Sequence, residues 1–328
     1  MMFWMVYAID KGLALNFGRT SNIHDYDVTT PRPNGSDFAF ATLNFYYNAW
    51  IDWAELQGAI YEQLFSAAAQ KQPDTIRIPR ARAMADQLLH FESQISQNLI
   101  VDGPMAAAMQ EFMLSSVVVV SCLLTLVYRV LPSPPGAHPL DFAEECVEAA
   151  RTALRRLGDS WKQIQPRDDE AWRGFINWTL LYVPFIPFIV VFGHTIAHRS
   201  REDLMLLDTA VSTLRSASQV APTINKLRDA CEKFCQIGTA YLAQEEAVAP
   251  QFNNSKPVSS SDVLPDGPLA YPTQMDFQAM SDFPMQQGEW DGMLNEWDLG
   301  LGAENAREMT AWFETYMSAQ QPPGTGIL

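Results

Sequence analysis

The sequence is short of basic side chains and of cysteine, and each shortage excludes a class of protein. Its 328 residues contain 22 Lys and Arg against 38 Asp and Glu, a formal net charge of −16. Because no stripe of Lys and Arg is present to neutralise phosphates, we expect no direct nucleic-acid binding by this chain. Four cysteines in so long a chain do not make a disulfide scaffold, so we expect free, buried thiols in a reducing compartment. They are Cys122, Cys146, Cys231 and Cys235.

Motifs of catalysis are also missing. The sequence contains no Gly-rich phosphate loop, no nucleophile elbow and no Ser/His/Asp arrangement. The acidic run RDDEAW, residues 167–172, would suit half of a magnesium–diphosphate site, but no second acidic motif accompanies it. We interpret Asp168, Asp169 and Glu170 as charges that favour a helix N-terminus. The sequence therefore predicts a protein that is not an enzyme.

Two pairs of possible metal ligands have helical spacing. His194 and His198 lie four residues apart, as do Cys231 and Cys235, so a mixed site of two His and two Cys is arithmetically possible. A catalytic zinc helix needs Glu directly after the first His, where this chain has Thr195. Ligand pairs of structural zinc sites usually lie about two to four residues apart around turns. We therefore expect ordinary histidines, inert thiols, no metal site and no cofactor.

Regular strand alternation is scarce, and what the sequence contains instead is helical periodicity. Apolar residues recur at intervals of three and four through residues 38–69, which predicts a long amphipathic helix. Asx-type turns and two prolines in residues 21–37 exclude regular structure there. The sequence thus predicts an all-α, irregular multi-helix domain. Further helices are expected over residues 80–98, 139–157, 169–182, 201–217 and 222–244.

The chain opens with a predicted helix over residues 3–17 that is apolar on every side and ends at Gly18. Such a helix belongs to the middle of a large core, yet nothing before Met1 supplies an N-cap or the other half of that core. We therefore expect a C-terminal fragment or a shortened gene model. Asp10 either pairs with Arg19 or faces a solvent groove. The stripe that contains Asp10 consists of Phe3, Val6, Leu13 and Phe17.

Two uncharged runs raise the alternative of a membrane protein with two spans. Residues 112–128 and 174–197 lack charges for 17 and 24 residues. The first run is short for a span, and the second contains Pro184 and Pro187, which a bilayer tolerates only under the cover of other helices. We favour buried core helices for both runs and expect no membrane partner.

The stretch FWMVYAIDKGLALNFGRTSNIHDYDVTTPRP, residues 3–33, resembles the signature of the fungal-specific transcription factor domain. This domain is the middle homology region of fungal zinc-cluster transcription factors. Its signature is an aromatic-rich helix ending in Asp-Arg, then Leu-rich sequence, Gly-Arg-Pro, and a loop with spaced Asp and closing prolines. Lys11 stands here for the usual Arg, and Thr20 for the usual Pro. The matching residues are Asp10, Gly18, Arg19, Asp25, Asp27, Pro31 and Pro33.

A second stretch, residues 182–214, resembles the C-terminal part of the same domain, where two Pro-Phe pairs precede an apolar run and Asp-x-x-Leu-Leu. The resemblance covers residues 1–245 and implies an N-terminally incomplete helical domain that regulates transcription by RNA polymerase II in the nucleus. Members of the family bind DNA through an N-terminal six-cysteine cluster with two zinc ions, and no such cysteine spacing occurs here. A stand-alone modulator that pairs with a full-length relative, as a homo- or heterodimer, stays open. The Pro-Phe pairs are Pro184, Phe185, Pro187 and Phe188.

The composition changes after the predicted helical domain. Residues 246–275 are rich in Ser and Pro, as in a linker, and residues 276–328 form an acidic, aromatic tail. Negative charges that keep bulky apolar groups solvated are typical of activation segments that fold into a groove of a coactivator. Near residues 305–318 we expect a short amphipathic helix, which docks on its own domain or adds to activation. The candidate tail residues are Trp290, Met293, Leu294, Trp297, Leu299, Trp312 and Phe313.

Overall fold

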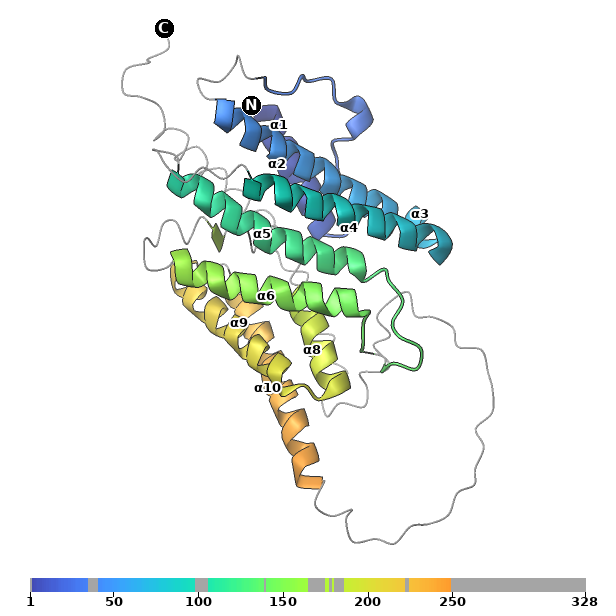
Figure 1. Cartoon of the computed structure of the whole chain (residues 1–328), viewed down its shortest axis with the longest axis vertical. Helices are drawn as coiled ribbons and strands as arrows, with labels where there is room; N and C mark the ends of the chain where they lie inside the picture. Colours follow the sequence, from blue (N-terminus) through green and yellow to red (C-terminus); the bar gives the residue numbers. More distant parts are fainter. Residues whose placement is uncertain are drawn as a thin grey trace.

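The computed structural model (Figure 1) confirms the all-α prediction, because every regular element in the residues it describes is a helix. The described residues are 2–34, 41–97, 106–138, 140–164, 175–176, 179, 186–221 and 224–248. The α-helices are α1 (Met2–Asn16), α2 (Ala41–Ile60), α3 (Ala67–Gln70), α4 (Asp74–Gln97), α5 (Ala106–Tyr128), α6 (Glu144–Ile164), α8 (Ile186–His198), α9 (Arg201–Val220) and α10 (Asn225–Val248). Asp168, Asp169, Glu170 and all the tail candidates lie outside the described residues.

The helices are stacked along the longest axis of the molecule. Figure 1 shows α1 and α2 at one end, followed by α4, α5 and α6. Helices α8 and α9 pack against the other side of α6, and α10 packs against α8 and α9. The core is therefore a series of apolar layers between neighbouring helices, with α5 and α6 forming the central pair.

The position of α5 explains the uncharged run at residues 112–128. Val118 belongs to the core layer shared with α6, α8, α9 and α10, whereas Val119 and Leu123 belong to the layer shared with α2 and α4. A helix covered on two sides is apolar nearly all round. By length and composition, Gln110–Tyr128 is the one helix among the described residues that could cross a membrane, and 61% of it is buried inside the protein. The other apolar helix, α8, has 13 residues.

The first helix is not buried on every side, which corrects the prediction from its composition. Trp4 and Tyr7 are buried, whereas Val6 is 49% exposed. The stripe that contains Asp10 is half-buried or exposed throughout. Gly18 does end the helix, since its φ of +61° is a conformation that other residues rarely adopt.

The single helix predicted over residues 38–69 is interrupted. A π-helical turn, Tyr61–Phe65, follows α2, and Ser66 then adopts extended backbone. The Ser66 hydroxyl accepts a hydrogen bond from the Ala69 backbone N–H at 3.1 Å, so a side chain that can cap a helix starts α3. The apolar spacing does not reveal this break, because it continues through residues 61–69. The cap at Ser66 separates α3 from the preceding helix.

Other helix ends differ from the prediction by part of a turn or more. Helix α4 begins at Asp74, before the predicted residue 80, and contains Pro79 in its second turn, where one backbone hydrogen-bond donor is missing. Helix α6 begins and ends later than the predicted range 139–157. Segment 21–34 contains one 3-10 turn, Asp25–Asp27, and no α-helix. The helix predicted over residues 169–182 lies mostly outside the described residues.

Candidate functional site

The N-terminal motif folds the loop that follows α1 back onto that helix, and Asp10 makes the first connection. Its Oδ2 accepts hydrogen bonds from the Ser21 hydroxyl and from the Ile23 backbone N–H, the latter at 2.9 Å. Its Oδ1 accepts a hydrogen bond from Asn22 Nδ2 at 2.9 Å. A carboxylate at this position can satisfy three donors of a turn that has no regular structure of its own. Asp10 is thus a cap for residues 21–23.

Arg19 is not the partner of Asp10, so the predicted ion pair is wrong. The Arg19 guanidinium lies 4.7 Å from the centre of the Phe17 ring, an exposed cation–π contact. Partial burial raises the pKa of Asp10, but the hydrogen bonds from Ser21, Ile23 and Asn22 outweigh it and hold the pKa below its usual range. The side chain is therefore stabilised as an anion by dipoles rather than by a countercharge.

Lys11, the next residue, is fully buried and makes the second connection. Its Nζ lies 2.7 Å from Oδ1 of Asp25, and the same oxygen accepts a hydrogen bond from the Tyr7 hydroxyl at 2.7 Å. Gly58 of α2 leaves room for the stem, because a Cβ there would lie 2.9 Å from Lys11 Cδ. Burial and Asp25 together raise the pKa of Tyr7. The Lys–Asp pair holds the 3-10 turn of the loop over α1.

The closing prolines of the motif are held through their carbonyl groups. Trp4 Nε1 donates to the Pro31 carbonyl at 3.0 Å, and Asn48 Nδ2 donates to the Pro33 carbonyl at 3.2 Å. Arg32, between them, forms ion pairs with two carboxylates of α2. We call this set the N-terminal clamp. It comprises Trp4, Tyr7, Asp10, Lys11, Asp25, Pro31, Arg32 and Pro33, with Asp52 and Glu55 of α2.

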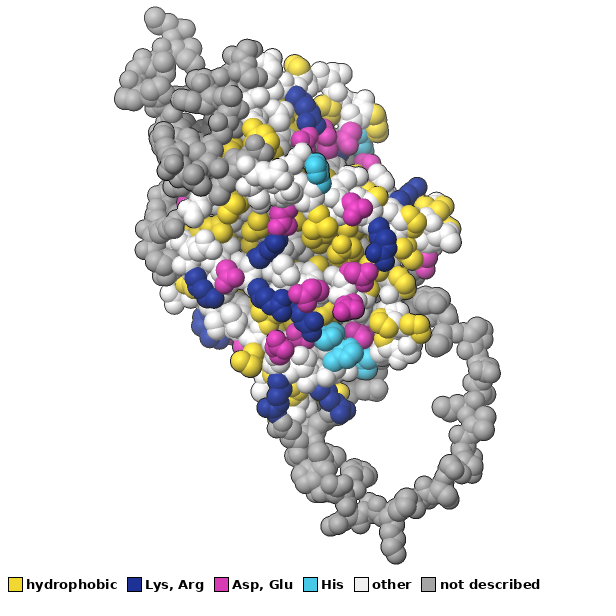
Figure 2. Space-filling view, viewed as in Figure 1, with side chains coloured by type: hydrophobic (Ala, Val, Ile, Leu, Met, Phe, Trp, Pro, Cys, Tyr) yellow, Lys and Arg dark blue, Asp and Glu magenta, His cyan; other side chains and the backbone are white. Residues whose placement is uncertain are grey.

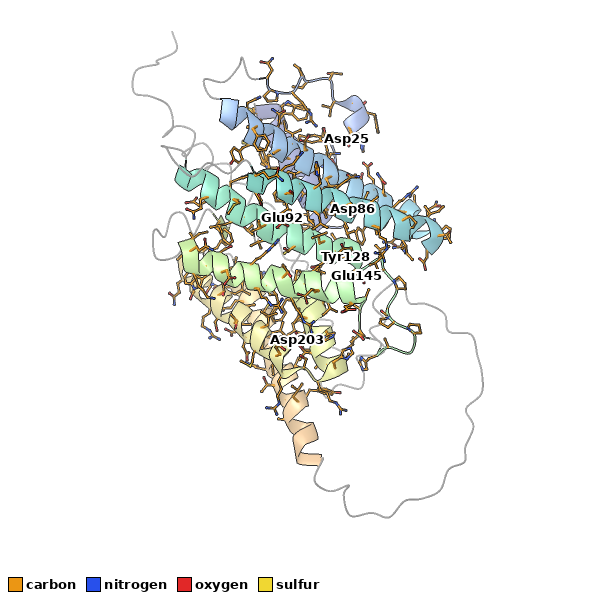
Figure 3. The ribbon with its side chains drawn as sticks, viewed as in Figure 1. Asp25, Asp86, Glu92, Tyr128, Glu145 and Asp203 are labelled. Atoms are coloured by element: carbon orange, nitrogen blue, oxygen red, sulfur yellow. The ribbon has the colours of Figure 1, made fainter. Side chains whose placement is uncertain are left out.

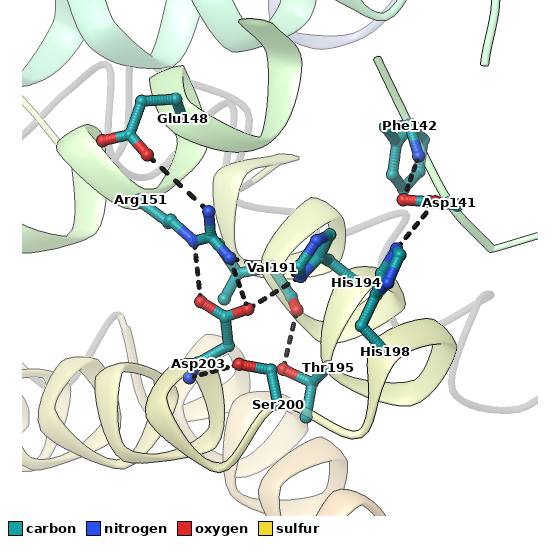
Figure 4. Close-up of polar contacts among 10 residues, drawn as sticks. All are labelled: Asp141, Phe142, Glu148, Arg151, Val191, His194, Thr195, His198, Ser200 and Asp203. Carbon is teal, nitrogen blue, oxygen red and sulfur yellow. Dashed lines mark hydrogen bonds and ion pairs between the residues drawn. The ribbon is translucent and has the colours of Figure 1, made fainter. Parts of the chain in front are cut away.

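The second motif supplies core residues and a polar cluster. Pro187 and Phe188 are buried in α8, and the Phe188 ring lies 6.4 Å from the Phe234 ring of α10. Pro184 and Phe185 lie outside the described residues. The polar cluster is at the other end of α8, where the chain turns into α9 (Figure 4).

Asp203 is the buried centre of this polar cluster, far from Asp25 in the molecule (Figure 3). Arg151 of α6 donates to it from both Nε and Nη2 at 2.8 Å, and His194 Nδ1 lies 2.8 Å from its Oδ2. Its backbone N–H donates to the Ser200 hydroxyl, the N-cap of α9. Burial raises the pKa of Asp203, but its bonds with His194, Arg151 and Ser200 bring it well below the usual range. The bidentate pair joins α6 to the α8–α9 turn.

His198 lies one helical turn after His194 and contacts a different carboxylate. Its Nε2 is 2.7 Å from Oδ2 of Asp141, which lies in the loop before α6, and the two imidazole rings stack with centres 4.2 Å apart. One possible ligand atom from each of these three residues lies within 4.8 Å of the others. Neither Cys231 nor Cys235 belongs to the group, so the mixed site of two His and two Cys does not form.

The four thiols are free, as predicted. Burial raises the pKa of Cys122, Cys146 and Cys235 to about 12, and the pKa of Cys231 well above its usual value. Because thiolates are the reactive form, none of these cysteines is an activated nucleophile at neutral pH.

Sequence reasoning missed Arg151 and Asp141. Arg151 carried a signal, because it stands one turn after Val147 and close to Leu154 on the buried side of α6. A charge there needs a buried partner. Asp141 carried none, because nothing in its local sequence shows which helix its loop will contact.

Comparison with known proteins relates the chain to fungal regulators. It is 22% identical over 282 residues to an ABC-transporter-regulating transcription factor of Aspergillus fumigatus, and 22% identical over 289 residues to a protein of the same name from Aspergillus oryzae. Each match covers 75% of this chain and 30% of the relative, so the chain spans less than a third of their length. No family model and no solved structure matches the chain. Its distant homologues are therefore fungal transcription factors, which are not enzymes.

Proposed function

We propose that this chain is the helical regulatory region, with its activation tail, of a fungal zinc-cluster regulator of transcription by RNA polymerase II. The observation that carries the proposal is the similarity to two fungal transcription factors over three quarters of the chain. The proposal places the protein in the nucleus and gives it no catalytic role.

The N-terminal clamp supports this proposal through the way its residues are used. Asp10, Asp25, Pro31 and Pro33 were identified from a family resemblance, and all four hold one loop against α1 and α2. Their polar groups are engaged with neighbouring groups of the same chain. This arrangement suits a scaffold that presents surfaces to other proteins better than it suits a substrate site.

DNA recognition in this proposal comes from a six-cysteine zinc cluster outside this sequence, either in the same polypeptide or in a full-length partner. The surface charge of this chain agrees with DNA recognition by a module outside it. On the face shown in Figure 2, Lys and Arg side chains alternate with Asp and Glu, and no continuous basic surface covers that face. Non-specific binding to phosphates depends on such a surface.

The tail supplies contacts with coactivators. Between residues 262 and 314 the sequence has eleven acidic residues and one basic residue, interspersed with aromatic groups. The negative charges keep bulky apolar groups solvated, and Trp290, Leu294 and Trp297 supply the apolar anchors that a coactivator groove would bury.

The full chain fused to an unrelated DNA-binding domain tests the proposal in a yeast reporter strain. We expect the fusion to activate transcription and the triple variant Trp290→Ala, Leu294→Ala, Trp297→Ala to lose most of that signal. The matched control is the double variant Phe252→Ala, Tyr271→Ala, which removes aromatic groups from the linker, residues 246–275. A triple variant that activates as strongly as the unmodified fusion contradicts the activation role.

A further inference from the structure

The group formed by Asp141, His194 and His198 has the composition of a divalent-metal site. Its donors are two imidazoles one helical turn apart and one carboxylate, the ligand types that zinc takes in proteins. The Asp141 side chain is 7% exposed, that of His194 18% and that of His198 49%. The group therefore has a buried side that fixes its geometry and an open side through which an ion can enter.

The fold brings Asp141 to the two histidines by a close approach of backbone to backbone. Gly193 of α8 faces the loop, and a Cβ built on it would lie 2.5 Å from the Leu140 carbonyl oxygen. Glycine is required there, because any side chain would push the loop away from α8. The Ser133 hydroxyl also donates to the Asp141 carbonyl at 2.9 Å and holds the end of the loop in place.

The environment of His194 leaves the correct nitrogen available. Its Nδ1 lies 2.8 Å from Asp203 Oδ2 and 3.3 Å from Arg151 Nη2. In the tautomer that carries its proton on Nδ1, the ring donates to the carboxylate and Nε2 keeps its lone pair for a metal. Metal-binding histidines usually donate their second N–H to a carboxylate in this way. Arg151 neutralises Asp203 through two hydrogen bonds, and its charge is itself balanced by Glu148 at 3.7 Å. The carboxylate that orients His194 is therefore fixed before any ion binds.

We propose that Asp141, His194 and His198 form a site for one divalent transition-metal ion, with Zn²⁺ as the ion it takes. Nε2 of both histidines and one oxygen of Asp141 bind the ion, and water completes a tetrahedron. The hydrogen bond between His198 Nε2 and Asp141, now 2.7 Å long, is replaced by two bonds to the ion. Ligand atoms of tetrahedral zinc are about 3.3 Å apart, so the loop moves outward by a fraction of an ångström. The ion would fasten the loop before α6 to the end of α8.

Zinc binding by the full chain tests this site directly. After treatment with a chelator, the protein is titrated with Zn²⁺ against a chromophoric competitor, and in parallel with Co²⁺ while its visible absorbance is recorded. We expect one equivalent to bind, with a tetrahedral Co²⁺ spectrum that lacks the charge-transfer band of a thiolate ligand. His198→Ala and Asp141→Asn should each weaken Zn²⁺ binding by at least about tenfold.

Two further variants separate the site from other causes. His90→Ala removes an exposed histidine of α4 that contacts Gln94, and it should leave binding unchanged. Gly193→Ala keeps all three ligand residues in the sequence but displaces the loop that carries Asp141, so it should weaken binding as Asp141→Asn does. Circular dichroism without metal confirms that each variant is folded. Absence of zinc binding by the folded protein, equal binding by His198→Ala, or a thiolate signature in the Co²⁺ spectrum would overturn the proposal.

Discussion

Lys11 and Asp25 are joined across the N-terminal clamp by an ion pair whose two members have very different surroundings. The Lys11 side chain is completely buried, whereas that of Asp25 is 49% exposed, and their charged atoms are 2.7 Å apart. Removal of either partner therefore has different consequences. A buried ammonium without its countercharge cannot be solvated, whereas a half-exposed carboxylate without its lysine can.

Asp25→Ala is expected to destabilise the protein more than Lys11→Met. Loss of the carboxylate leaves the buried Nζ without a countercharge and also removes the acceptor of the Tyr7 hydroxyl, so we expect a loss of about 3 kcal/mol in the free energy of unfolding. Lys11→Met keeps most of the volume and should cost about 1 kcal/mol. Urea unfolding of the full chain followed by circular dichroism measures both. Asp27→Ala, an exposed aspartate of the same turn, is the control. Equal losses for the two clamp variants would contradict the asymmetry.

Asp10 makes the stability of the clamp depend on pH. Its pKa in the folded protein is below its usual value because three hydrogen bonds favour the anion. The carboxylate therefore stabilises the fold at pH above the unfolded-state pKa of about 3.9, and this contribution is lost as the pH falls through the lower folded-state pKa. Asp10→Asn should cost about 1–2 kcal/mol near pH 7, and the difference from the unmodified protein should shrink below about pH 4. Urea unfolding at a series of pH values measures it, and a difference that grows in acid would contradict the assignment.

The sequence predicted where most of the helices lie along the chain, but not which faces of each helix are buried. Periodic apolar spacing located the helices later found as α4, α6, α9 and α10, because a face that packs against a core must repeat with the helical turn. It gave the wrong environment for α1, whose composition is apolar all round although Val6 is half exposed. Composition reports what a helix can bury, and only the arrangement of its neighbours decides which sides are covered.

The polar contacts were harder to predict for a related reason. The sequence offered Arg19, just after the first helix, as one alternative for Asp10, yet the backbone and side chains of residues 21–23 satisfy the carboxylate instead. The contact of His198 with Asp141 joins positions 57 residues apart, and the close approach at Gly193 that permits it has no sequence pattern. Long-range pairs of this kind depend on how two helices and a loop meet.

Two buried glycines should respond in opposite ways to alanine. Gly158 of α6 has only Thr209 Cγ2 near the new Cβ, at 3.9 Å, so Gly158→Ala should stabilise the protein by about 0.5–1 kcal/mol through helix propensity. At Gly58 the new methyl group would lie 2.9 Å from the Lys11 stem, and displacing a buried lysine from Asp25 should cost about 1–3 kcal/mol. Thermal unfolding of the two variants measures the contrast. Stabilisation by Gly58→Ala would mean that Lys11 is not held tightly in the clamp.

Arg156 and Arg155 are neighbours in α6 with very different roles, and they provide the sharpest test of how the central helices are joined. Arg156 donates to both oxygens of Glu92 on α4, at 2.6 and 3.0 Å, and to the Val117 carbonyl and Ser121 hydroxyl of α5, at 2.9 and 2.7 Å. Arg155 forms an ion pair with Glu148 of its own helix, and both of these side chains are about half exposed.

Arg156→Ala is therefore expected to lower the free energy of unfolding by about 3 kcal/mol, because Glu92 and two groups of α5 lose their donor in a partly buried site. Arg156→Lys should recover only part of this loss, since an ammonium group cannot make the bidentate contact with Glu92 while it also reaches α5. Arg155→Ala should change stability by less than about 0.5 kcal/mol, because an exposed ion pair on one helix contributes little. Urea unfolding of the three variants at one salt concentration measures these differences. Similar values for Arg155→Ala and Arg156→Ala would contradict the conclusion that Arg156 links α6 to α4 and α5.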